Sequence, residues 1–227
     1  MKTGQREEQA DDRAETRSRW RGVCERVGFS GDAHVLCEQL RVRYAEPWRV
    51  YHNLEHIEDC LAVFSEAAPH APSLDIEVAI LFHDAVYAVG AADNELRSAE
   101  FARELLLQIG ANAGFIDDVV RLVLATDHRR ALLDDRERLI CDVDLSILGR
   151  APANYDRYAA AIFREVGLSE REFAPHRLAF LRMMLGKAHI FHTEDFRQRY
   201  EQAARANLAR EVRDWEARIG GSLGSTR

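Results

Sequence analysis

His83 and Asp84, whose side chains bind metal ions well, end a stretch of the chain that is otherwise apolar. Residues 76–82 before them contain one charged residue, Glu77. Burying an imidazole beside a carboxylate is costly unless something binds both groups. A divalent metal ion is the usual partner where further His and Asp residues are available. The chain supplies such residues at His52, His56, His128, Asp142 and Asp144.

Helix geometry separates the two aspartates of the segment 140–148. Positions two residues apart point to nearly opposite sides of a helix, at about 100° per residue. Asp144 lies in the middle of the predicted buried face, and Asp142 lies opposite, toward solvent or a neighbouring loop; the face itself consists of Ile140, Val143, Ile147 and Leu148. An aspartate centred on an apolar face needs a cation or several donors. We therefore predict Asp144 as a metal ligand, with a hydrogen-bonded carboxylate as the alternative.

His52 and His56 are four residues apart and would share one face of a continuous helix. His56 neighbours an apolar stripe and can point inward, so we predict it as a metal ligand. His52 lies at the expected helix start, beside an N-cap residue, Asn53. We predict it as a substrate contact or as a residue that supports the ligands. A histidine alone is more often structural, but the pair together with His83-Asp84 favours function.

The predicted ligand set, His56, His83, Asp84 and Asp144, contains two imidazoles and two carboxylates. Such a mixed set suits Mn²⁺, Mg²⁺, Fe²⁺, Co²⁺, Ni²⁺ or Zn²⁺, and no thiolate in it requires zinc. Sites of this kind usually leave positions for water. The ion lowers the pKa of that water, so that hydroxide is available near neutral pH.

Composition narrows the class of protein. The 227 residues suit one domain, and the net charge of −7 argues against a general nucleic-acid or anionic-membrane binder. The four cysteines form no CxxC pair and are expected to be buried in a reducing compartment. No signal peptide or membrane-spanning stretch is evident. We expect a cytoplasmic protein with flexible segments at 1–18 and 220–227 and a single helical domain at 19–219.

Apolar periodicity predicts an all-α fold with no strand. The stretch 74–86 is apolar nearly all round, which is typical of a central buried helix. Gly149 is expected to act as a C-cap. The stripe on the last helix either packs on the bundle or forms a homodimer contact. The predicted helices are 20–27, 33–44, 53–67, 74–86, 94–109, 116–128, 136–148, 155–166, 172–191 and 194–219.

The ordered set His56, His83-Asp84 and Asp144 resembles the HD superfamily of metal-dependent phosphohydrolases. The chain is closer still to a bacterial branch of predicted HD-superfamily hydrolases. That resemblance extends over roughly residues 33–212, and its segments are 49–57, 81–87, 94–99, 126–128, 142–149 and 204–208.

This resemblance implies an all-α helical bundle with a metal ion at its centre, bound by the four predicted ligands. It also implies hydrolysis of a phosphoester or phosphoanhydride, most often in a nucleotide, by attack of metal-bound hydroxide. The expected partner is therefore a small phosphorylated molecule. The glycine common after His-Asp in the superfamily is absent here, where Ala-Val-Tyr follows at residues 85–87. This fits the branch rather than the cyclic-dinucleotide phosphodiesterases and leaves the substrate open.

Three residues are candidates for catalysis, and one of them is also a predicted ligand. That residue, Asp84, is expected both to bind the ion and to orient the attacking water. Glu95 is predicted to be a general acid/base; the alternative is a carboxylate favoured by the dipole at a helix N-terminus. His128 could bind phosphate or a second metal ion, protonate the leaving oxygen, or be structural.

Other residues are candidates for substrate binding. Arg49 and Arg97 are predicted phosphate contacts, because guanidinium binds phosphate in bidentate geometry; isolated arginines are more often surface residues. His52 is expected to contact substrate. Tyr87 is predicted to contact substrate as well, and for both Tyr87 and Tyr51 the alternative is that the ring simply packs.

Two alternative functions remain open at this point. HD-type oxygenases and lyases have similar sites but tend to need two metal ions, and His52 and His128 could hold the second. A non-catalytic helical domain that binds a nucleotide is the other alternative, although the complete His, His-Asp, Asp set argues against it.

Overall fold

Helices form all the regular secondary structure of the residues that the computed structural model describes, which are 19–27, 33–68 and 73–223. The all-α prediction is confirmed. The chain divides into two compact units between Ile140 and Cys141, within α7 (Asp135–Leu145). The single domain predicted at 19–219 stays a prediction, and the predicted flexible segment 1–18 lies outside the described residues. No helix in the described ranges is long and apolar enough to cross a membrane.

The first unit is built around α4, a short helix whose residues are mostly buried. It packs against α3, α5 and α6, which confirms the predicted central helix. Six of its nine residues are buried. The helices of this unit are 19–27, α2 (Ala33–Tyr44), α3 (Leu54–Ala67), α4 (Leu74–Phe82), α5 (Asn94–Gln108) and α6 (Ala113–Ala125).

The predicted continuation of α4 to Val86 is wrong, because the helix ends at Phe82 with His83 as its C-cap. Side chains from elsewhere bind the backbone beyond this point. Arg49 donates to the carbonyl oxygens of Asp84 and Ala85, and the Ser98 hydroxyl bonds the backbone of Val86. These external partners replace the hydrogen bonds that a further helical turn would make.

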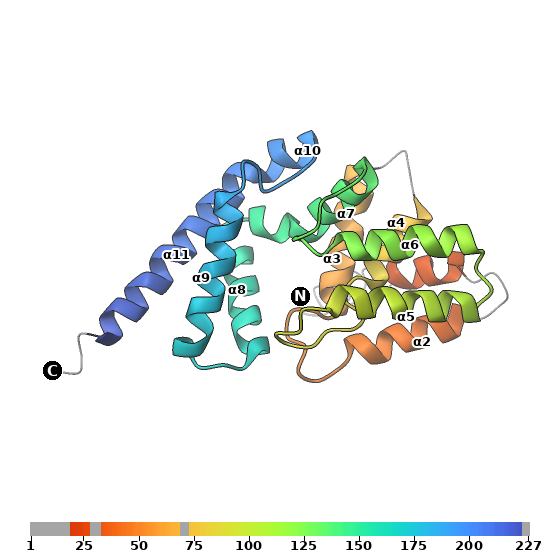
Figure 1. The fold of residues 1–227 in the computed structure, drawn as a ribbon, viewed down its shortest axis with the longest axis horizontal. Helices are drawn as coiled ribbons and strands as arrows, with labels where there is room; N and C mark the ends of the chain where they lie inside the picture. Colours follow the sequence, from red (N-terminus) through yellow and green to blue (C-terminus); the bar gives the residue numbers. More distant parts are fainter. Residues whose placement is uncertain (1–18, 28–32, 69–72, 224–227) are drawn as a thin grey trace, which may run out of the picture. The chain divides into compact units, whose positions relative to one another are not determined.

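In the second unit α11 packs against α9 (Figure 1). The single helix predicted at 194–219 is interrupted, since η2 has π-helical hydrogen bonding, and α11 continues to Leu223 rather than ending before Gly220. The predicted helix 172–191 begins at Glu170 and ends at Gly186. The elements are η1 (Ser146–Gly149), α8 (Pro152–Val166), α9 (Glu170–Gly186), α10 (Glu194–Phe196), η2 (Arg197–Glu201) and α11 (Gln202–Leu223).

Gly149 is not the C-cap of a helix that ends at Leu148. It is the last residue of η1, and Arg150 is the cap. Its missing side chain matters for a different reason, because a Cβ atom there would lie 2.5 Å from Cβ and 2.7 Å from the carbonyl oxygen of Tyr200. Glycine is therefore needed where η1 and η2 approach each other closely.

Asp142 contacts a neighbouring loop, one of the two environments predicted for it, and is fully buried there. Its carboxylate accepts hydrogen bonds from the backbone N–H groups of His192 and Thr193, both at 2.7 Å, and from the Thr193 hydroxyl at 2.7 Å. Nδ1 of His192 lies 3.0 Å from the same carboxylate. The buried carboxylate of Asp142 thus helps to hold the loop before α10 in place.

Candidate metal centre

Three of the predicted ligands come together in the first unit. Nε2 of His56 lies 3.2 Å from Nε2 of His83, and Oδ2 of Asp84 lies 3.1 Å from the His83 nitrogen and 3.6 Å from the His56 nitrogen. Both histidines are buried, and Asp84 is half-buried. Three donor atoms this close together could bind one metal ion.

The hydrogen bonding of His83 fits a metal ligand. Its Nδ1 lies 2.9 Å from the carbonyl oxygen of Ile80, a position in which only a protonated Nδ1 can donate. The neutral tautomer then has its lone pair on Nε2, the atom that faces His56 and Asp84. A backbone acceptor that fixes the tautomer in this way is usual for histidines that bind metals.

When the neighbouring imidazoles are protonated, they keep Asp84 ionised. Burial on its own raises the pKa of this carboxyl group, but the nearby imidazoles outweigh burial and bring the pKa well below its ordinary value; they are those of His83, His52 and His56. An ionised carboxylate beside two imidazole nitrogens is a donor set that divalent cations of the first transition row accept.

The start of α3 positions His56. The side chain of Asn53 accepts hydrogen bonds from the N–H groups of Glu55 and His56, which confirms it as the N-cap. One turn further along α3, the Sγ atom of Cys60 lies 3.7 Å from Nδ1 of His56. From the sequence we interpreted Cys60 only as a small apolar residue, although its spacing of four from His56 was a signal.

Arg49 holds the segments around the cluster together. Its side chain is fully buried and donates to the carbonyl oxygens of His52, Asp84 and Ala85 at 2.7–3.1 Å and to the Glu46 carboxylate at 2.8 Å. These bonds occupy its guanidinium from several directions. The structure therefore gives Arg49 a positioning role, and contact with substrate stays a prediction.

Two polar residues on one face of α5 fix the loop after Asp84. Ser98 accepts from the N–H and donates to the carbonyl of Val86, and Asn94 does the same with Ala88. We assigned neither residue a role from the sequence. Their spacing of four, with Ser98 fully buried, is the pattern that could have indicated a shared backbone partner.

Glu95 lies in the first turn of α5 near other charged groups. Burial raises the pKa of its carboxyl group, and the negative charges of Asp127 and Asp84 raise it further. Arg129 binds the Asp127 carboxylate and the carbonyl oxygen of Ala92, which brings the loop after α6 to the start of α5. That loop contains the half-buried His128, whose role stays a prediction.

Aromatic rings lie around His56 of α3 and around His52, which precedes that helix. The rings of His52 and Tyr87 stack with centroids 4.1 Å apart, and Tyr51 lies 4.7 Å from His56. The structure thus brings His52, Tyr51 and Tyr87 to the cluster. Arg97 is exposed on α5, and no hydrogen bond or ion pair links it to the cluster in the described part of the chain. Asp144 is half-buried in the second unit, so its place in the ligand set stays a prediction.

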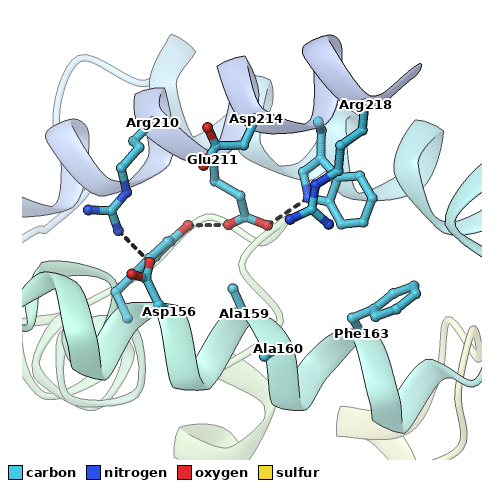
Figure 2. Close-up of a pocket in the computed structure, with 10 residues that line it drawn as sticks. Asp156, Ala159, Ala160, Phe163, Arg210, Glu211, Asp214 and Arg218 are labelled. Atoms are coloured by element: carbon cyan, nitrogen blue, oxygen red, sulfur yellow. Dashed lines mark hydrogen bonds and ion pairs between the residues drawn. The ribbon is translucent and has the colours of Figure 1, made fainter. Parts of the chain in front are cut away.

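A separate cavity of about 450 Å³ lies in the second unit, between α8 and α11 (Figure 2). None of the predicted site residues lines it. Its buried carboxylate, Glu211, accepts hydrogen bonds from Tyr155, Arg177 and Trp215, and Arg210 pairs with Asp156 at its edge. Because these polar groups satisfy one another, we place the candidate chemistry at the cluster and not here.

Comparison of the chain with protein-family models found no match, and comparisons with curated proteins and with solved structures found none either.

Proposed function

We propose that this protein is a metal-dependent phosphohydrolase of HD type, which hydrolyses a phosphoester or phosphoanhydride in a small molecule. The observation that supports this most directly is the convergence of His56, His83 and Asp84 within 3.6 Å of one another. Asp144 is the proposed fourth ligand. A divalent ion bound by this set would supply Lewis acidity and a water of lowered pKa.

Residues of the chain would orient the water, transfer the proton and bind the substrate. Asp84 would orient the water that attacks the phosphorus atom. Glu95, whose pKa is raised, would hold a proton and transfer it to the leaving oxygen. His52, beside Tyr87, would contact the phosphorylated group from the outer side of the cluster.

The test is phosphate release after the protein has been stripped of metal and reloaded with Mn²⁺, Mg²⁺, Fe²⁺, Co²⁺, Ni²⁺ or Zn²⁺. The substrates are a panel of nucleotides and sugar phosphates. We expect turnover in the wild type and none in Asp84→Asn or His83→Ala, with helical content by circular dichroism unchanged. His34→Ala removes an exposed histidine of α2 and is the matched control.

Two results would contradict the proposal. One is a metal-free Asp84→Asn protein with full activity. The other is absence of phosphate release with every metal; if the chain then bound two iron ions, the di-metal oxygenase or lyase class would replace the hydrolase.

A further inference from the structure

The side chain of Trp48 is partly exposed to solvent in a tight, hydrogen-bonded turn. It is 38% exposed, whereas Trp20 and Trp215 are 4% and 6% exposed. The turn runs from Glu46 to Arg49, with Pro47 at its second position, where proline restricts the backbone. It is closed twice, since the N–H of Arg49 donates to the Glu46 carbonyl at 3.0 Å and its guanidinium binds the Glu46 carboxylate.

A row of rings connects Trp48 with the candidate metal centre. The indole stacks on Tyr87 with centroids 5.9 Å apart and planes at 20°. Tyr87 stacks in turn on His52, which lies edge-on to His56 at 6.1 Å. The guanidinium of Arg49 lies 5.1 Å from the centroid of the indole. Single exposed apolar side chains are common. The indole of Trp48 differs because Tyr87 and Arg49 hold it in place, and because stacked rings connect it to the candidate metal centre.

We propose that Trp48 determines substrate specificity by stacking on an aromatic ring of the substrate while the phosphate is bound at His56, His83 and Asp84. This inference rests on the proposed function. A ring that is already immobilised loses little entropy on binding. Stacking on an exposed aromatic side chain accepts any flat π system, including every nucleobase. The substrates are therefore nucleoside phosphates, and phosphates without an aromatic ring are poor substrates.

Tryptophan fluorescence tests the contact directly, because the other two tryptophans are buried. The probes are the 5′-mono- and triphosphates of adenosine, guanosine, cytidine and uridine, with ribose 5-phosphate and inorganic triphosphate as controls that lack an aromatic ring. Titrations use Asp84→Asn, in the presence and absence of Mg²⁺, so that nothing is hydrolysed. We expect saturable quenching by at least one nucleotide and by neither ribose 5-phosphate nor inorganic triphosphate. The signal should be lost in the double variant with Trp48→Leu.

Kinetics separate specificity from catalysis. Trp48→Leu in the otherwise wild-type chain should raise KM for the nucleotide about ten- to a hundredfold and leave kcat within a few-fold. Hydrolysis of ribose 5-phosphate should not change. Trp48→Phe keeps a ring and should recover most of the loss. Leu107→Ala removes another exposed apolar side chain, on α5, and should have no effect.

The outcomes distinguish this inference from the proposed function. Quenching that depends on Trp48, without turnover of any compound, would support the ring contact and overturn the hydrolase. Turnover with equal KM in wild type and Trp48→Leu, or equal affinity for ribose 5-phosphate and nucleotides, would overturn the ring contact alone. Absence of nucleotide binding by fluorescence and calorimetry would also overturn it.

Discussion

The Nε2 atoms of His56 and His83 lie 3.2 Å apart in the interior of the first unit. Two imidazolium ions at this distance would repel each other strongly in a buried site. The Asp84 carboxylate faces both rings, with Oδ2 3.1 Å from Nε2 of His83 and 3.6 Å from Nε2 of His56. A bound cation would satisfy all three groups at once.

Metal binding should stabilise the fold. A ligand that binds only the folded state at a hundred times its Kd adds about 2.7 kcal/mol. We expect the Tm of the stripped protein to rise on addition of one of the six candidate metals and to fall again with EDTA. His83→Ala should abolish the shift, whereas His34→Ala should keep it. A Tm that responds to none of the metals would argue against the site.

Glu95→Gln should separate proton transfer from metal binding. We expect kcat to fall about 10²- to 10⁴-fold, with metal affinity unchanged. Because the pKa of Glu95 is raised, the limb of the pH–rate profile that it governs should lie above the usual carboxyl range and disappear in the variant. Glu100→Gln, an exposed carboxylate of the same helix, is the control. Loss of metal together with activity would instead make Glu95 a ligand.

Arg49→Met should destabilise the first unit by about 2–4 kcal/mol, because it leaves buried carbonyl oxygens without a donor. Urea unfolding measures the change. Arg41 pairs with Glu38 on the exposed side of α2, so Arg41→Met should have little effect. Equal unfolding midpoints for the two variants would show that the hydrogen bonds of Arg49 contribute no net stability.

Glu58 should make stability depend on pH. Burial raises the pKa of its carboxyl group to about 7 from the ordinary value of 4.5. A raised carboxyl pKa stabilises the folded state below the unfolded pKa, and this contribution is lost as the pH rises through about 7. Above that pH, Glu58→Gln should be more stable than wild type by about 2 kcal/mol once solvent screening is allowed for. At pH 4 the two should unfold alike. A constant difference from pH 4 to 8 would refute this account.

Gly149→Ala should cost about 1–3 kcal/mol, because its Cβ would overlap the backbone of Tyr200. Gly186 lies at the end of α9, where an added Cβ would meet no atom within 4 Å. Gly186→Ala should therefore be neutral or stabilising by about 0.5–1 kcal/mol. Thermal unfolding of both variants gives the comparison, and similar losses in the two would contradict the close approach.

Local patterns made part of the fold predictable. The N-cap at Asn53 and the apolar character of α4 depend on neighbouring residues in sequence. The end of α4 depends instead on Arg49 and Ser98, which lie far from it in the chain, and no periodicity within the helix reports on them. The stretch was therefore predicted to be one turn too long.

The same limit applies to the site. The identity and spacing of His56, His83 and Asp84 were sufficient to predict that they meet. A helical wheel could not decide between solvent and a loop for Asp142, because the partners that bury it, His192 and Thr193, lie 50 and 51 residues further along. Exposure on one face of a helix depends on segments that the helix itself does not specify.

Arg49 donates to the carbonyl of His52 on one side and to those of Asp84 and Ala85 on the other. The two segments that contribute the clustered histidines thus share one side chain. Opening either segment breaks bonds that hold the other, so they should open as a single cooperative unit in native-state hydrogen exchange. The amides of His56 and Val86 would then exchange with the same free energy of opening. A single local unfolding event would separate all the clustered ligands together, rather than releasing one ligand at a time.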